Sequence, residues 1–168
     1  ATYMTMNNPY FVNMDENIEE SVQAKGDILI TRDPLQDQKK QNEQIKDMIN
    51  EGIDVLFLQP VDRNKVRPAL ELCKKKHIPV VVIDSEVSDT EAVVSTIVSD
   101  NYDAGVQCAK DMMKKKTSAN IIIVNQKALN SINERVKGFR DTIKGHPQYK
   151  IVEEKESAAE FEIAMKVM

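Results

Sequence analysis

The chain has 168 residues and a mass of 19.0 kDa, which is enough for one sizeable core or for one domain and part of a second. Its net charge of −4 and pI near 5.3 argue against a general affinity for nucleic acid or anionic membranes. No apolar run approaches the roughly 18 residues of a membrane span. The chain opens on Ala1 without an initiator methionine, so we expect a removed leader or an excised piece.

Short apolar runs alternate with longer stretches of helical periodicity. Most of the runs are continuous in Val, Ile and Leu, which is typical of strands covered on both faces. The predicted strands are 1–6, 27–31, 54–59, 79–84, 93–98, 120–125 and 149–154. Helices of roughly 12–16 residues separate them. Strand and helix alternate at intervals of about 25 residues, which predicts an α/β fold with a doubly wound parallel sheet and right-handed crossovers.

Capping residues support the helix boundaries. Asn8 followed by Pro9 predicts an N-cap with proline at the first helical position. Gly52 is expected to close a helix before the next strand. Pro68 lies inside the third helical stretch and predicts a kink or a late start of that helix.

Polar side chains and one aromatic pair follow the predicted strands. In open parallel sheets, ligands bind beyond the carboxyl ends of the strands. The residues at those positions are Asn7, Asn8, Tyr10, Phe11, Asp33, Gln59, Asp62, Asp84, Ser85, Ser99, Asp100, Asn101, Asn125 and Gln126. This set suits a sugar, whose hydroxyl groups both donate and accept hydrogen bonds and whose C–H face can lie on an aromatic ring. The alternative for Tyr10 and Phe11 is core packing, and we expect one ring to line the cleft and the other to share the core.

Other kinds of site lack their sequence signatures. The five glycines form no GxGxxG motif and no Walker loop, and the chain has no GxSxG motif. His77 and His146 are isolated and are expected to be surface or structural residues. Cys73 and Cys108 lie in helix-like segments without CxxC spacing and are expected to be buried or idle thiols, so no metal site is predicted. No cofactor is predicted either. Asp33 and Asp84 could form a general acid/base pair. Carboxylates at strand ends also cap helices and accept ligand hydroxyls, so we predict that the protein is not an enzyme.

Five segments occur in an order and at spacings that resemble one family: "MNNPYF", "LQPVD", "IPVVVIDSEV", "IVSDNYDAG" and "NERVKGF". They are similar to the ribose-type sugar-binding proteins of bacterial ABC transporters, in the type I periplasmic-binding superfamily. The resemblance runs from Thr5 to Met168 and implies flavodoxin-like lobes that close on a ligand about a hinge. Members of the family are longer. The resemblance therefore implies an N-terminal ligand-binding lobe over 1–102 without its return segment, and the first part of an incomplete C-terminal lobe over 103–168.

The resemblance assigns ligand-binding roles by position. The residues implied are Asn8, Tyr10, Phe11, Gln59, Asp84, Ser85, Asn101, Arg135 and Phe161. Asp84 would grip sugar hydroxyls, and the fork of Arg135 would bond two oxygens from the second lobe. Gln59 and Ser85 stand where ribose binders typically carry asparagine and arginine, and both changes reshape the pocket expected for ribose. The segment around Phe161 resembles the one that carries a second-lobe aromatic, although it is about two residues short.

The implied function is that of an extracytoplasmic sugar-binding protein. It would capture a small neutral sugar between two lobes and deliver it to the membrane permease of an ABC importer. The location would be the periplasm, or the cell surface as a lipoprotein in a Gram-positive organism, and no nucleic-acid partner is expected. The alternative is a ligand-sensing effector domain of a lactose-repressor-like regulator, or a sugar sensor acting on a membrane sensor kinase. An upstream helix-turn-helix region would favour the regulator, and a signal peptide or a lipid-anchored cysteine would favour the transporter.

Overall fold

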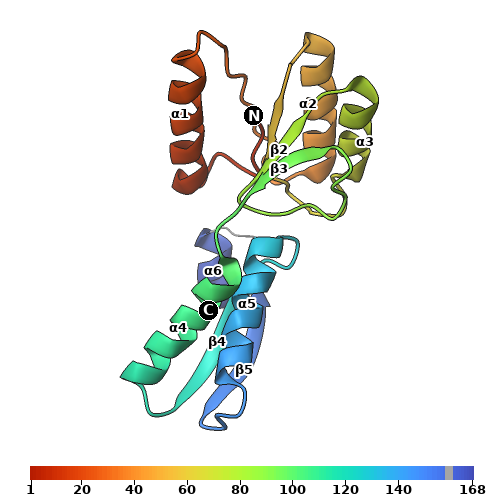
Figure 1. Ribbon diagram of the computed structural model, residues 1–168. Helices are drawn as coiled ribbons and strands as arrows, with labels where there is room; N and C mark the ends of the chain where they lie inside the picture. The colour runs from red at the N-terminus through yellow and green to blue at the C-terminus, as the bar shows by residue number, and fades with distance from the viewer. Residues whose placement is uncertain (158–160) are drawn as a thin grey trace. The chain divides into compact units, whose positions relative to one another are not determined.

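The computed structural model describes residues 1–157 and 161–168 and divides the chain into two compact units, Ala1–Ile97 and Val98–Met168. We call them the first and the second unit. The first unit contains α1 (Pro9–Gln23), α2 (Gln38–Glu51), β1 (Leu56–Leu58), α3 (Arg67–Lys76), β2 (Val80–Ile83) and β3 (Val93–Ile97). The second unit contains α4 (Asn101–Lys115), β4 (Ala119–Asn125), α5 (Asn130–Ile143), β5 (Tyr149–Glu156) and α6 (Phe161–Val167), as Figure 1 shows. The lobe boundary expected after residue 102 falls inside α4.

The first unit is built on a parallel sheet in which β2 lies between β1 and β3. Thr2 adds parallel bridges to both Leu58 and Arg32, so the chain near Thr2 lies between β1 and the segment at Arg32. Counted in chain order, the segments are arranged 2-1-3-4-5, which is the order of the flavodoxin-like fold. The prediction of a doubly wound parallel α/β fold is confirmed.

The two predicted strands nearest the N-terminus are shorter than the sequence indicates. Only isolated bridges form in or beside 1–6 and 27–31, so the prediction of regular strands there is wrong. Beyond Thr2, a side chain replaces the backbone partner, because the Met4 N–H donates to Oε1 of Gln59 at 2.6 Å. The 27–31 segment lies at the edge of the sheet and has a neighbouring segment on one side only.

Helix ends follow the predicted capping chemistry. Oδ1 of Asn8 accepts the Tyr10 N–H at 3.0 Å, and α1 begins at the following proline. Gly52 ends α2 in the left-handed region, with φ of 90°, which only glycine adopts readily. The late start predicted from Pro68 is confirmed, because α3 begins at Arg67.

The core of the first unit lies between the sheet and the pair α2 and α3. Its buried apolar side chains include Ile45, Met48, Leu56, Leu58, Leu70, Cys73, Val80 and Val82. Figure 1 shows α2 and α3 together on one side of the strands, with α1 on the other. Burial of this apolar surface is the main source of stability, at about 25 cal/mol per Å².

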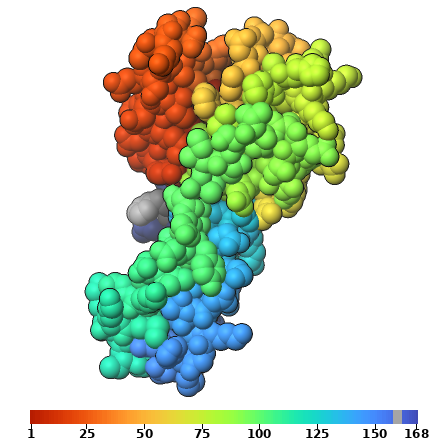
Figure 2. All heavy atoms as spheres, viewed as in Figure 1, coloured from red at the N-terminus to blue at the C-terminus, as the bar shows by residue number. Residues whose placement is uncertain are grey.

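The second unit packs two helices against each other beside the parallel pair β4 and β5. The atoms of α4, in green, and of α5, in blue, form one continuous surface in Figure 2. Two glycines allow the contact. A Cβ on Gly105 would lie 1.9 Å from the carbonyl oxygen of Arg135, and one on Gly138 would lie 2.1 Å from that of Tyr102. The helix backbones therefore touch directly.

The two cysteines, Cys73 and Cys108, differ in accessibility. Cys73 is buried in the core, and this burial raises the pKa of its thiol to about 11. Cys108 on α4 is exposed. We expect a thiol reagent such as dithiobis(nitrobenzoate) to label one thiol quickly at about pH 8 and the second only after unfolding. A Cys108→Ser variant should lose the fast phase and Cys73→Ser should keep it. A fast phase that survives Cys108→Ser would contradict the burial of Cys73.

Candidate functional site

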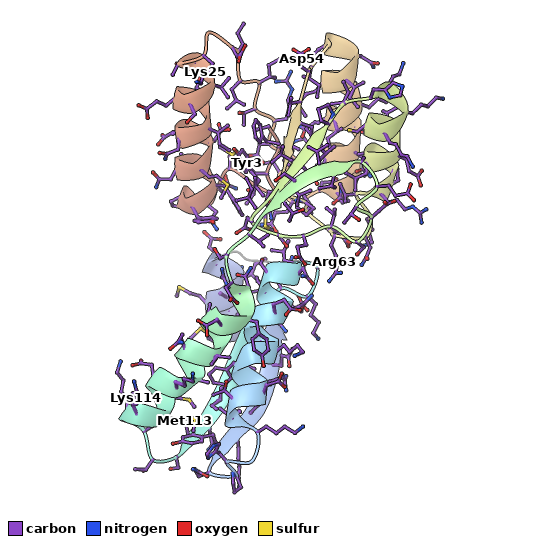
Figure 3. The ribbon with its side chains drawn as sticks, viewed as in Figure 1. Tyr3, Lys25, Asp54, Arg63, Met113 and Lys114 are labelled. Atoms are coloured by element: carbon purple, nitrogen blue, oxygen red, sulfur yellow. The ribbon has the colours of Figure 1, made fainter. Side chains whose placement is uncertain are left out.

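The strand order of the first unit defines a switch point, and parallel α/β sheets bind ligands at the carboxyl edge beside such a point. The segments on either side of the switch point are the one at Thr2 and β1, which lead away in opposite directions across the sheet. In Figure 3, Arg63 marks the carboxyl edge of these strands, whereas Lys25 and Asp54 mark the opposite edge. Predicted site residues of this unit follow the carboxyl ends of three neighbouring segments, those at Thr2, β1 and β2.

The aromatic pair at the start of α1 divides between core and solvent. Phe11 is 4% exposed, and its ring centroid lies 6.0 Å from that of buried Tyr3. Figure 3 shows Tyr3 between α1 and the strands. Tyr10 is 51% exposed and meets Phe11 edge-on at 5.4 Å. Phe11 thus packs in the core while the Tyr10 ring is accessible to solvent. This agrees with the expectation that one ring of the pair shares the core.

Asn8 holds the same turn through one end of its amide. Its Oδ1 is used in capping α1, and its Nδ2 has no hydrogen-bond partner among the described residues. A planar amide fixed at its oxygen presents the nitrogen in a set direction. Asn8 can therefore donate to a ligand oxygen without giving up the cap.

Asp84 stands at the end of β2 in a backbone conformation that is costly for a residue with a side chain. Its φ is 64°, and the Ser85 N–H donates back to the Ile83 carbonyl at 2.7 Å, which closes a tight γ-turn around Asp84. The Asp84 N–H donates to the Ile97 carbonyl at 2.9 Å. Such strain costs about 1–3 kcal/mol and is characteristic of functional positions. The turn brings the half-buried Asp84 to the rim and buries Ser85 beneath it.

Gln59, at the end of β1, is fully buried. Its Oε1 accepts the Met4 N–H, and its Nε2 has no hydrogen-bond partner among the described residues. A buried donor without a partner costs about 1–3 kcal/mol. The oxygen therefore supports the first segment, and the nitrogen is a buried donor without a partner among the described residues.

In the second unit the structure brings two predicted site residues together. Nε of Arg135 on α5 donates to Oδ1 of Asn101, the first residue of α4, at 2.8 Å. Nδ2 of Asn101 donates to the Ser99 carbonyl at 3.0 Å. Phe161 is the first residue of α6, and its side chain lies outside the described part of the chain. None of these contacts tests ligand binding, so the predicted roles stay predictions.

Comparison with known proteins identifies the family. The model of the periplasmic binding protein domain matches residues 2–168. The chain belongs to this family. The ribose import binding protein of Bacillus subtilis is 32% identical over 105 residues, which cover 62% of this chain and 34% of that protein. The ribose import binding protein of Haemophilus influenzae is 29% identical over 145 residues, covering 84% and 49%.

Solved structures agree with this membership in the periplasmic binding protein family. An ABC transporter solute binding protein from Mycobacterium smegmatis, crystallised with bound glycerol, matches with a TM-score of 0.85 and 29% identity. The match covers 90% of this chain and 53% of that chain. The chain thus spans about half the length of its relatives or less.

One residue of this periplasmic binding protein domain that sequence reasoning missed is Gln41. Its Nε2 donates to the Gln59 carbonyl at 2.9 Å, and its Oε1 accepts the Val61 N–H at 3.0 Å. Nε2 also lies 3.3 Å from Oγ1 of Thr2. The signal was present, since Gln41 precedes Ile45 by four residues on the buried stripe of α2. A polar residue at a core position of a helix indicates a buried hydrogen-bond network.

The carboxylates near the rim have structural partners. Oδ1 of Asp33 accepts the Leu35 N–H at 2.8 Å and so holds a turn in which Leu35 is left-handed, with φ of 55°. Burial opposes ionisation of Asp62, but the backbone N–H groups of Asn64 and Lys65 and the Lys65 ammonium lower its pKa below the usual value. Asp33 and Asp62 thus each stabilise a turn of the backbone.

The described residues include one tyrosine with a shifted pKa and lack both a metal-ligand cluster and a helix able to cross a membrane. Burial, and then the nearby Asp15 carboxylate, raise the pKa of Tyr3, which keeps its phenol neutral. No group of three or more potential metal ligands lies together within the described ranges. Among the same residues, no helix is both long and apolar enough to cross a membrane.

Proposed function

We propose that the protein is an extracytoplasmic sugar-binding protein that captures a small neutral sugar and delivers it to the permease of an ABC importer. The single observation that carries the proposal is the rim of the first unit. There an exposed aromatic ring and an amide with a free N–H group follow the segment at Thr2, and a strained carboxylate follows β2, on the other side of β1. Family membership and the similarity to ribose import binding proteins support the same function.

The chemistry of the rim favours a neutral ligand with several hydroxyl groups. Tyr10 offers an apolar face, Asn8 a donor and Asp84 an acceptor, and a sugar presents a complement to each. The chain is acidic and lacks a phosphate-binding glycine loop, which disfavours phosphorylated sugars. Ser85 stands where ribose-type binding proteins typically carry an arginine, and this change reshapes the expected pocket, so the proposal is not specific to ribose.

A thermal-shift panel tests the proposal. Pentoses, hexoses, sugar phosphates and cyclitols are added to the full-length protein, and a ligand of the folded state raises the melting temperature by mass action. We expect a shift with a neutral sugar or cyclitol and none with sugar phosphates. If no member of the panel shifts the melting temperature, the sugar-binding function is wrong. Binding to a sensor kinase rather than to a permease would favour the sensor alternative.

Replacing Tyr10 with leucine is expected to weaken binding of the active sugar about tenfold, equivalent to about 1.4 kcal/mol, because the stacking face is lost. The melting temperature without sugar should hardly change, since Tyr10 is half exposed. Tyr10→Phe is the matched control, because it keeps the ring and should keep the affinity. Phe11 is unsuitable for this test, since it is buried in the core. Equal affinities of Tyr10→Leu and the wild type, measured by calorimetry, would exclude Tyr10 as the platform.

A further inference from the structure

A chain of hydrogen bonds in the second unit runs from the end of one helix to the middle of another. The Ser99 carbonyl accepts from Nδ2 of Asn101, and Oδ1 of Asn101 accepts from Nε of Arg135. Asn101 is only 7% exposed, whereas Arg135 is exposed. The amide of Asn101 is thus engaged at both ends and shielded from solvent.

The backbone of Arg135, like its side chain, is held by a direct contact with α4. Gly105 lies against the Arg135 carbonyl so closely that a Cβ there would be 1.9 Å from the oxygen. One turn further along α5, Gly138 lies against Tyr102 in the same way. Because both helix backbones touch, Arg135 cannot shift along α4 without breaking the packing of the unit.

This arrangement decides which edge of the guanidinium is available. Arginine has five N–H donors in a planar fork, and Nε belongs to the side edge that Asn101 occupies. The two terminal nitrogens have no hydrogen bond and no ion pair within the described part of the chain. They form the end edge of the fork, which matches two neighbouring oxygens.

We infer that Asn101 is a positioning residue, which holds Arg135 through Nε so that its two terminal nitrogens meet adjacent oxygens of the sugar. This inference rests on the proposed sugar-binding function. It also changes the expected role of Asn101, since its amide is 7% exposed and uses both ends to hold Arg135 and the Ser99 carbonyl rather than to contact the sugar. Arg135, held by Asn101, would donate to two neighbouring oxygens rather than to a single hydroxyl group. The site would therefore favour sugars with two unsubstituted hydroxyl groups on adjacent carbons.

A double-mutant cycle on the full-length protein tests the inference, with affinity for the sugar found in the thermal-shift panel as the readout. We expect Asn101→Ala to weaken binding about tenfold and Arg135→Met about a hundredfold. The double variant should bind no worse than Arg135→Met alone, because Asn101 acts only through Arg135. A double variant weaker by the product of the two effects would mean that Asn101 contacts the sugar directly, and would overturn the inference.

A sugar-free measurement separates this inference from the proposed function. The Arg135 Nε–H signal in NMR spectra should be protected from solvent exchange in the wild type, and Asn101→Ala should abolish that protection. Gln107→Ala, on the exposed side of α4, is the matched control and should preserve it. If the signal is protected but no sugar binds, the proposed sugar-binding function is wrong, whereas the hydrogen bond between Asn101 and Arg135 is confirmed. An unprotected signal in the wild type would overturn the positioning role even if sugar binds.

Discussion

Replacing Gln41 with leucine is expected to destabilise the first unit by about 3–5 kcal/mol, although leucine fills nearly the same volume. The side chain of Gln41 satisfies the Val61 N–H and the Gln59 carbonyl, and both groups are buried. Without the amide, each is left without a partner, at a cost of about 1–3 kcal/mol apiece. The nearby Thr2 hydroxyl loses its neighbour as well.

Urea unfolding followed by circular dichroism measures this cost as a change in the midpoint at constant slope. Gln23→Leu is the matched control, because Gln23 is an exposed glutamine at the end of α1, and its replacement should stay within about 0.5 kcal/mol of the wild type. A loss below about 1 kcal/mol for Gln41→Leu would show that water replaces the amide and that the network is not needed.

The effect on binding follows from what the network supports. Gln41 fixes Gln59, and Gln59 fixes the backbone of Met4, which leads into the turn at Asn8. The Met4 carbonyl accepts in addition the Gln36 N–H at 2.7 Å, from the neighbouring loop. The side-chain amides of Gln41 and Gln59 therefore support the backbone that leads to the rim. We expect Gln41→Leu to lose sugar affinity even at temperatures where it remains folded.

The parts of the fold that were predictable carry local signals. The valine-rich run at 79–84 and the Asn8–Pro9 start of α1 each specify their structure through residues that are close in sequence. The failures at 1–6 and 27–31 have a different origin. Regular pairing there depends on distant side chains and on edge position, neither of which is visible in a local pattern.

The candidate site shows the same division. The sequence places Tyr10 and Phe11 in one turn, but only the tertiary contact with Tyr3 decides which ring is buried. The positive φ of Asp84 could not be predicted from the local sequence, because aspartate tolerates that region better than most residues but adopts it at only a few positions. The hydrogen bond between Asn101 and Arg135 joins residues 34 positions apart and likewise follows from helix packing.

The second large effect is expected at the crossing of α4 and α5. Gly105→Ala should destabilise the second unit by about 2–3 kcal/mol, because the new methyl group must displace a backbone carbonyl rather than a flexible side chain. Besides the Arg135 oxygen, the Cβ would lie 2.9 Å from the Phe139 nitrogen. Alanine gains about 1 kcal/mol in helix propensity over glycine, so a net loss of stability must come from the crossing. Lys110→Ala, on the exposed face of α4, is the control and should be nearly neutral.

Comparing Gly105→Ala with Gly138→Ala shows whether the two glycines share one contact. Each methyl group would force the helices apart at a neighbouring point of the crossing, so the separation made by the first substitution relieves part of the second. We expect the double variant, measured by urea unfolding, to lose less stability than the sum of the single losses. Strict additivity would mean that the two sites relax independently. Since the same separation moves Arg135 away from Asn101, both single variants should also lose the protection of the Arg135 Nε–H, which connects the packing of the helices to the geometry of the proposed sugar contact.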